Sequence, residues 1–149
     1  MKKNNSVDKK KEEKDIIIVI TELMDKLDHR TLVIWATDCA EHVLSYFEEK
    51  YPKDNRPRKA IEAGRAWVHG KISVGDVRAA AFAAHVAARN AKEVVARAVA
   101  RSAGHAAATA HVAGHAIHTA NYAAIVSVNE RIWQYQHLLD LAKKRNITP

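Results

Sequence analysis

The chain has 149 residues, a net charge of +7 and a hydrophobic fraction of 48%, which fits one domain with its own core. Its single cysteine, Cys39, excludes a disulfide within the chain. The longest apolar run, 16–20, is too short to cross a bilayer, and no signal peptide is recognisable. We therefore expect a cytoplasmic protein without a membrane span.

Helical periodicity dominates the chain between two polar ends. The first segment, 1–14, is rich in charge and predicts a disordered, solvated tail or the frayed start of a helix, and 146–149 is expected to fray. Residues 15–145 are expected to form a single helical domain, because apolar residues recur there at spacings of three and four. The sequence predicts an all-α, single compact bundle of about six to seven helices, at 15–27, 30–50, 57–70, 74–90, 92–110, 112–126 and 129–145.

Local signals support several of these helix ends. Asp28 is a predicted N-cap of the second helix, and Ser73 with Asp76 resembles an N-terminal capping pattern for the fourth. Gly70 is a predicted C-terminal stop. Gly64 lies inside the third helix at a cost of about 1 kcal/mol relative to alanine, so a close helix crossing is expected there.

One stretch, 79–124, organises the rest of the chain. Nearly half of it is alanine, which has the best helix propensity and lets neighbouring helices approach closely. The core should therefore be alanine-rich, thin and closely packed. A thin core also makes a homodimer an expectation, because dimerisation would bury further surface.

The same stretch carries five of the nine histidines, and three of them form a candidate metal site. His111, His115 and His118 are spaced by four and seven residues, so a continuous helix would place them on one face. Such a face could chelate a divalent metal, with His85 or Asp38 completing the site. The alternative, which we favour, is that these histidines are interior or rim groups bonded to neighbouring helices. No cofactor is therefore assigned.

A second candidate constellation is Asp38 with His42, one helical turn apart. The carboxylate would fix the imidazole tautomer, as in a general base. Cys39 lies toward the apolar side and is expected to be a small core residue, so the pair has no clear nucleophile. A structural side-chain pair is the favoured interpretation.

Arginines are numerous but dispersed over several predicted helices. Arg58, Glu62 and Arg65 form a charged ladder at spacings of four and seven, and Arg89 lies one helix further on. These residues could orient an anion. Nucleic-acid binding is not favoured, because the arginines do not cluster in one helix and no aromatic residues are interleaved with them.

Four segments, taken together and in this order, carry a resemblance to a known family: IWATDCAEHVL, RPRKAIEAGRAW, SVGDVRAAAFAAHVAAR and ARSAGHAAATAHVAGHA. They resemble the Imm-5-like family of small bacterial immunity proteins, over about residues 28–125. The resemblance implies an all-α domain. It also implies a cytosolic protein that binds and neutralises a cognate toxin.

An immunity-type binding protein is therefore the first functional hypothesis. Two alternatives stay open: a metal-dependent or acid–base enzyme, and a binder of an anionic ligand. Both alternatives would use a polar seam of charged and histidine side chains: Asp38, His42, Arg58, Glu62, Arg65, His85 and Arg89. They require that residues from different predicted helices converge in one pocket.

Overall fold

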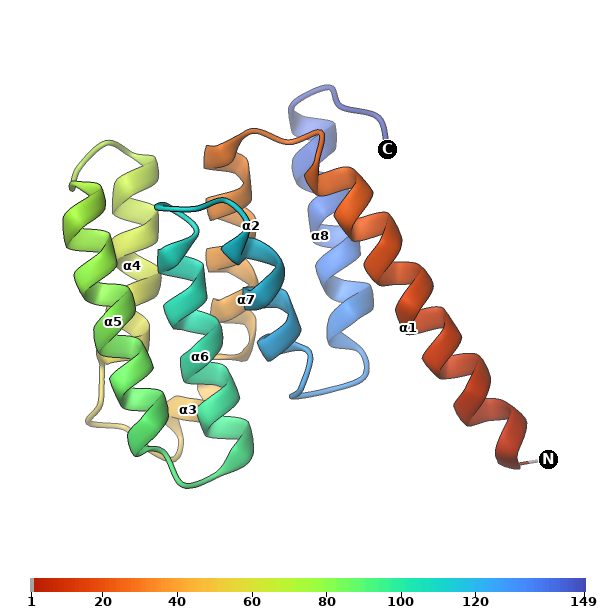
Figure 1. Ribbon diagram of the computed structural model, residues 1–149, viewed down its shortest axis with the longest axis horizontal. Coiled ribbons are helices and arrows are strands. Elements are labelled where there is room, and N and C mark those ends of the chain that lie inside the picture. Colours follow the sequence, from red (N-terminus) through yellow and green to blue (C-terminus); the bar gives the residue numbers. More distant parts are fainter. Residues whose placement is uncertain (1) are drawn as a thin grey trace.

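The computed structural model describes residues 2–149, with side chains from Val7 onward, and this part of the chain contains eight α-helices and no strand (Figure 1). The all-α prediction is confirmed. In chain order the helices are α1 (Lys2–Met24), α2 (His29–Val43), α3 (Ser45–Glu48), α4 (Arg56–Val68), α5 (Val74–Asn90), α6 (Val94–Ala108), α7 (His115–Ala123) and α8 (Glu130–Lys144).

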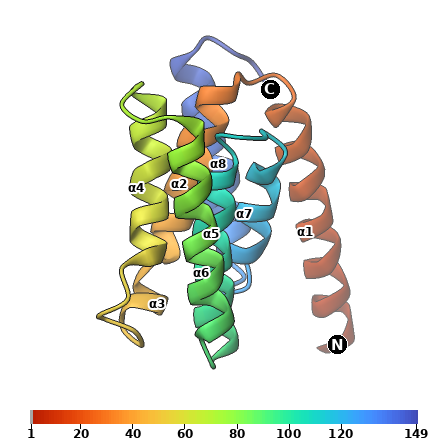
Figure 2. The ribbon, with the colours of Figure 1, turned by 60° about the vertical axis from the view of Figure 1, so that its left-hand side comes forward.

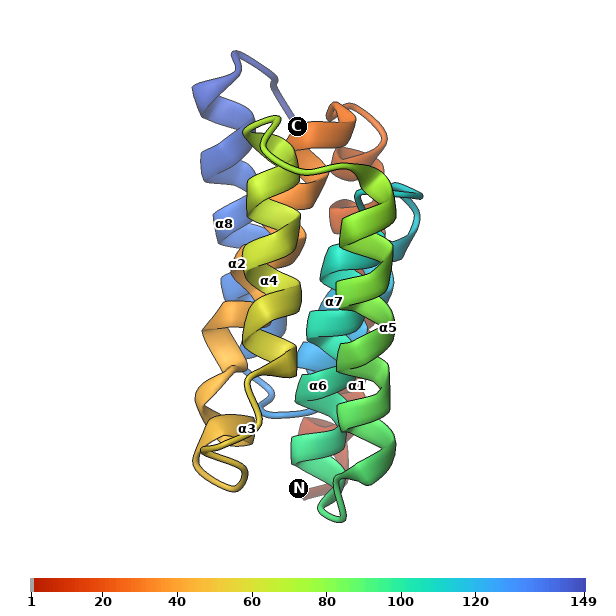
Figure 3. The same cartoon turned by 90° about the vertical axis from the view of Figure 1, so that its left-hand side faces the viewer.

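Helices α2 and α6 form the centre of the bundle. Helix α2 contacts α4, α6, α7 and α8, while α6 packs between α5 and α7 and also touches α4 (Figures 1 and 3). Helix α1 lies at the edge and packs mainly on α8 (Figure 2). The outer sides of α5, α6 and α7 therefore remain on the surface.

The core is built largely from alanine. More than half of the buried hydrophobic residues are alanines, and α6 alone buries six of them. The two largest fully buried side chains, Trp35 and Phe47, lie on α2 and α3. Small side chains let the helix axes approach closely, and the large residues fill the remaining space.

The predicted close crossing at Gly64 is present, between α4 and α2. A Cβ atom on Gly64 would lie only 2.8 Å from Cγ2 of Thr37. The side chain of Thr37 is fully buried, and its hydroxyl donates to the carbonyl oxygens of Val33 and Ile34. Glycine is therefore needed at position 64 for the two helices to pack at this distance.

The predicted caps are also formed. Asp28 accepts a hydrogen bond from the backbone N–H of Thr31 at 2.7 Å, and Ser73 accepts one from Asp76 at 3.2 Å. Gly70 follows α4 with φ of 70°, a left-handed conformation that glycine adopts without a Cβ clash. Local sequence chemistry thus determines these helix ends.

The helix count is higher than predicted, because the expected helix 30–50 is divided at Leu44. There the backbone N–H of Leu44 donates to the carbonyl of Glu41, and the N–H of Phe47 donates to the carbonyl of Leu44. These tighter, three-residue bonds interrupt the α pattern and separate α2 from α3. The predicted count of six to seven helices is corrected to eight.

The first helix is longer than expected. It begins at Lys2, whereas periodicity placed its start near Asp15, because the charged residues before Asp15 are themselves good helix formers. The division of the chain into a charged tail 1–14, a domain 15–145 and a frayed end 146–149 stays a prediction. Within residues 2–149, none of the helices combines the length and the apolar character that crossing a bilayer requires.

Candidate functional site

Helix α5 presents one row of large side chains to the surface. Arg78, Phe82, His85 and Arg89 repeat at spacings of four, three and four, so they share one side of the helix. The Phe82 ring is 67% exposed, and the guanidinium carbon of Arg89 lies 5.9 Å from its centroid. This is a cation–π contact on an exposed aromatic ring.

His85 reaches from this row toward α6, where Gly104 provides the space for it. A Cβ on Gly104 would lie 2.7 Å from two atoms of the His85 ring. Nη1 of Arg101, on α6, donates to Nδ1 of His85 at 3.0 Å. Because arginine has only donors, Nδ1 of His85 is the unprotonated nitrogen of that ring.

His85 is one member of a histidine cluster that joins α5, α6 and α7, formed by His85, His105, His115 and His118. The ring of His105 is central: its centroid lies 4.9 Å from that of His85, 5.2 Å from that of His115 and 5.4 Å from that of His118. Nδ1 of His105 and Nδ1 of His115 are 3.0 Å apart, so one of these nitrogens donates to the other.

Two rings of the histidine cluster, His85 and His105, are uncharged at neutral pH. Burial, followed by the nearby positive charges of Arg101 and Arg89, lowers the pKa of His85 to about 4 from its ordinary value of 6.5. Burial and the neighbouring histidines likewise lower the pKa of His105 to about 4, and burial lowers the pKa of His115. The permanent positive charge next to the His85 ring comes from Arg101 and Arg89.

Two open hollows flank the contact between His85 and Arg101. The larger, of about 500 Å³, lies between α5, the end of α6 and the turn before α7; its lining includes Arg78, Phe82, His85, Ala108, His111 and His115. The smaller, of about 220 Å³, lies between α6 and α7 and is lined by Val94, Arg97, Ala98, Arg101, Tyr122 and Ile125. We call the surface made by both hollows the α5–α7 face.

The three histidines of the predicted metal site do not lie on one helix. Helix α6 ends at Ala108, and α7 begins only at His115, so His111 lies in the intervening turn. The three histidines do not share a continuous helical face, although His111 and His115 line the same hollow. In the described part of the chain, no three histidine, cysteine, aspartate or glutamate side chains are placed to hold a metal ion together.

The predicted pair of Asp38 and His42 is not formed either, because both residues have partners on other helices. Asp38 accepts from Nε2 of His137 at 2.7 Å and from Nη2 of Arg65 at 2.9 Å. His42 instead bonds to Glu130 through Nδ1 at 2.8 Å. Cys39, between them in sequence, is fully buried, and burial raises the pKa of its thiol well above the ordinary value.

Stacked aromatic rings join these two pairs on the opposite side of the bundle. The His42 ring stacks on Trp133 at 3.8 Å between centroids, and Trp133 stacks on His137 at 5.1 Å. The sequence indicated neither Trp133 nor His137 as a site residue. No local signal does so, since His137 lies 99 positions from Asp38 and only the packing of α8 on α2 brings them together.

The other residues of the predicted seam are distributed rather than convergent. Nε of Arg58 donates to Glu48 at 2.8 Å, and Arg65 also pairs with Glu41. The Glu62 side chain is exposed on α4. The predicted seam is thus divided between two regions: Asp38, His42, Arg58, Glu62 and Arg65 on α2 and α4, and His85 and Arg89 on the α5 row.

Two residues that no sequence pattern assigned to a site are central to the α5–α7 face. His105 holds the histidine cluster together, and Arg101 joins the two hollows. Together with Glu93 and Arg97 they form a series, 93, 97, 101 and 105, in which each residue follows the last by four positions. This spacing places them on a common side of α6. The spacing shows which side of α6 these residues share, but it does not show which helix packs against that side.

Comparison with known proteins agrees with the resemblance noted in the sequence. A family model described as Imm-5 like putative immunity protein matches residues 22–141. A search of curated proteins and a search of solved structures found no match. The matched residues run from the end of α1 into α8, so they include the whole α5–α7 face.

Proposed function

Since the chain belongs to the Imm-5 like putative immunity protein family, we propose that it binds a cognate bacterial toxin and neutralises it by protein–protein interaction. The observation that carries the proposal is the family match over 22–141, which spans nearly the whole helical bundle. The toxin would be met in the cytosol. A homodimer stays a separate prediction.

The surface of the bundle has features that support such a role. The α5–α7 face combines exposed apolar side chains with arginines, and arginine and aromatic residues dominate the energy of protein interfaces. Its two hollows are open rather than enclosed, and an open surface fits a protein partner better than a small ligand. The closely packed, alanine-rich helices beneath this face also hold it in a fixed conformation before a partner binds.

The alternative of an enzyme built on the seam is less well supported. It requires the seam residues Asp38, His42 and His85 to meet in one pocket with two of the candidate metal ligands, His111 and His115. Asp38 and His42 instead bond to His137 and Glu130 on α8, while the other three histidines line the hollow beside α5. The residues are thus engaged in two different regions of the molecule.

Growth rescue tests the proposal directly. Each toxin gene that neighbours the gene for this chain is expressed in a laboratory bacterial strain, alone or with this chain, and an unrelated immunity protein at equal level serves as the control. We expect one toxin to stop growth alone and to lose its effect only with this chain. The purified pair should also elute as one complex. If no toxin is neutralised by the chain, the proposal is wrong.

A further inference from the structure

We propose that the α5–α7 face is the docking surface of this protein and that its partner presents an acidic protein surface, with carboxylates arranged around an apolar centre. This inference rests on the proposed function and specifies where, and with what chemistry, the toxin is bound. Three features of this face support the inference independently: its positive charge, its exposed apolar side chains, and the contacts that hold its arginines in place.

The chain separates its charges in a way that favours an acidic partner. From Val77 to Asn129, which includes nearly all of α5 and the whole of α6 and α7, the only acidic residue is Glu93. The Glu93 carboxylate accepts a hydrogen bond from the Tyr51 hydroxyl at 2.7 Å. The same stretch has five basic residues: Arg78, Arg89, Lys92, Arg97 and Arg101. A surface of one sign attracts a partner of the opposite sign and steers its approach.

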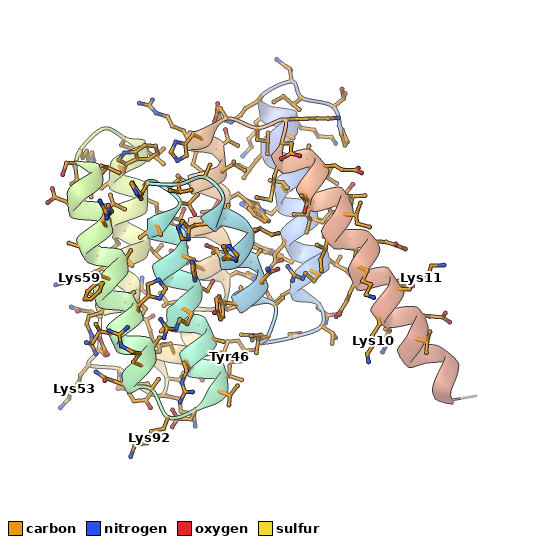
Figure 4. The ribbon with its side chains drawn as sticks, viewed as in Figure 1. Lys10, Lys11, Tyr46, Lys53, Lys59 and Lys92 are labelled. Atoms are coloured by element: carbon orange, nitrogen blue, oxygen red, sulfur yellow. The ribbon has the colours of Figure 1, made fainter. Side chains whose placement is uncertain are left out.

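A second basic region exists on α1, but it differs in character. In Figure 4, Lys10 and Lys11 lie on α1, at the other side of the molecule from α5. Acidic residues interrupt these lysines at Asp8, Glu12 and Glu13. The charge on α1 is therefore mixed, whereas no acidic residue is among those that line the two hollows of the α5–α7 face.

Apolar side chains lie exposed among the arginines of the face. Phe82 is 67% exposed, Val94 72% and Ile125 52%. Val94 and Ile125 line the smaller hollow, and Phe82 lines the larger one. Burying such residues under a partner removes apolar area from water, while the surrounding arginines pair with the carboxylates at its rim.

The arginines of the face are held in place before any partner arrives. Arg101 donates to the neutral His85 ring, Arg97 donates to the carbonyl oxygen of Ala91 at 3.0 Å, and Arg89 covers one side of Phe82. None of these three contacts neutralises the guanidinium charge. A braced arginine loses less side-chain freedom on binding than a free lysine, so more of the pairing energy remains.

These contacts favour a protein partner over a nucleic acid. Arg89 already occupies one side of the Phe82 ring, which limits stacking of a base there. Exposed valine and isoleucine side chains gain little from a phosphate backbone, whose contacts are made by charged and polar groups. A carboxylate-bearing protein surface can satisfy both the arginines and the apolar centre.

Two double variants with matched changes test the assignment. The face variant carries Phe82→Ser and Arg78→Glu, and the control variant carries Ile132→Ser and Lys143→Glu on α8. All four side chains are exposed, so both variants should fold, which thermal melting verifies. Each variant removes one exposed apolar side chain and reverses one positive charge.

The first arm uses the toxin that passes the growth-rescue test. We expect the face variant to bind it at least about tenfold more weakly than the original chain, and the control variant to bind it unchanged. Equal binding by the face variant would overturn the docking assignment while leaving the proposed function in place. A failure of the original chain to rescue growth would instead contradict the proposed function.

The second arm needs no toxin. Random peptides displayed on phage are selected against the full-length chain, and oligo(dT) is measured in parallel. We expect the enriched peptides to be rich in aspartate and glutamate beside an apolar residue, to lose binding to the face variant and to retain binding to the control variant. Enriched peptides without acidic residues, or tighter binding of oligo(dT) that is lost in the face variant, would overturn the proposal.

Discussion

Replacing Gly64 with alanine sets two opposing effects against each other. Alanine within a helix is more stable than glycine by about 0.5–1 kcal/mol, because the unfolded chain loses less freedom on folding. Against this, the new Cβ would lie 2.8 Å from Cγ2 of Thr37, closer than real Cβ atoms are found. Overpacking of a closely packed core costs about 1–3 kcal/mol. We therefore expect Gly64→Ala to lower the free energy of unfolding, by about 1 kcal/mol when the two ranges are combined.

Whether Gly64→Ala lowers or raises the free energy of unfolding depends on Thr37, which has little room to move. Its side chain is fully buried and β-branched, and its hydroxyl bonds to two carbonyl oxygens of α2. The methyl group therefore cannot rotate away without breaking these bonds. Gly75→Ala is the matched control, because Gly75 lies in the first turn of α5 with nothing closer to its Cβ position than Oγ of Ser73 at 3.7 Å.

Urea unfolding followed by circular dichroism measures both changes. We expect a lower midpoint for Gly64→Ala at unchanged slope, and an equal or higher midpoint for Gly75→Ala. Thr37→Ser keeps the hydroxyl and removes the clashing methyl, so adding it to Gly64→Ala should recover stability, with a coupling of about 0.5–3 kcal/mol. If Gly64→Ala stabilises the protein as much as Gly75→Ala does, the close packing of α4 on α2 is wrong.

Three further predictions concern a cap, acid stability and metal. Asp28→Ala should lower the free energy of unfolding by about 1 kcal/mol, measured by urea unfolding, because the N–H of Thr31 loses its acceptor. The unfolded chain binds protons at His85 and His105 below pH 6.5, whereas their pKa of about 4 keeps the folded state neutral. Stability should therefore fall as the pH drops from about 6.5 to about 4, and His105→Gln should flatten that slope in urea unfolding at several pH values. Finally, a chelator should leave the thermal melt of untagged protein unchanged, because no three ligands are grouped in the described residues; a drop would contradict this.

Local chemistry made most of the helices and several of their ends predictable. Asp28, Ser73 and Gly70 act within a few residues of their own positions, so the sequence contains the whole interaction. The close crossing at Gly64 was also predictable, because glycine in a helix is costly without a compensating contact. The division at Leu44 was not predictable. It arises where backbone hydrogen bonds join residues three apart in place of four, and no proline or glycine marks that position.

The grouping of site residues could not be predicted, because it depends on how helices pack. Asp38 and His42 have the right spacing for a pair, yet α8 supplies His137 and Glu130 as competing partners. His111 shares the spacing of a metal site, but the break after Ala108 removes it from the helix that holds His115. Sequence spacing shows which residues share one side of a helix, but only the packing of the helices determines which residues lie opposite that side.

The alanine core and the α5–α7 face have a common structural origin. In α5, α6 and α7, the inward positions are mostly alanine, so nearly every large or charged side chain of these helices lies at the surface or its rim. Close packing of small side chains leaves the backbone little freedom to rearrange. A partner should therefore dock on this face with small backbone changes, as in preorganised complexes. Arginine and Phe82 variants of the face should then act mainly on the dissociation rate, whereas added salt should act mainly on the association rate.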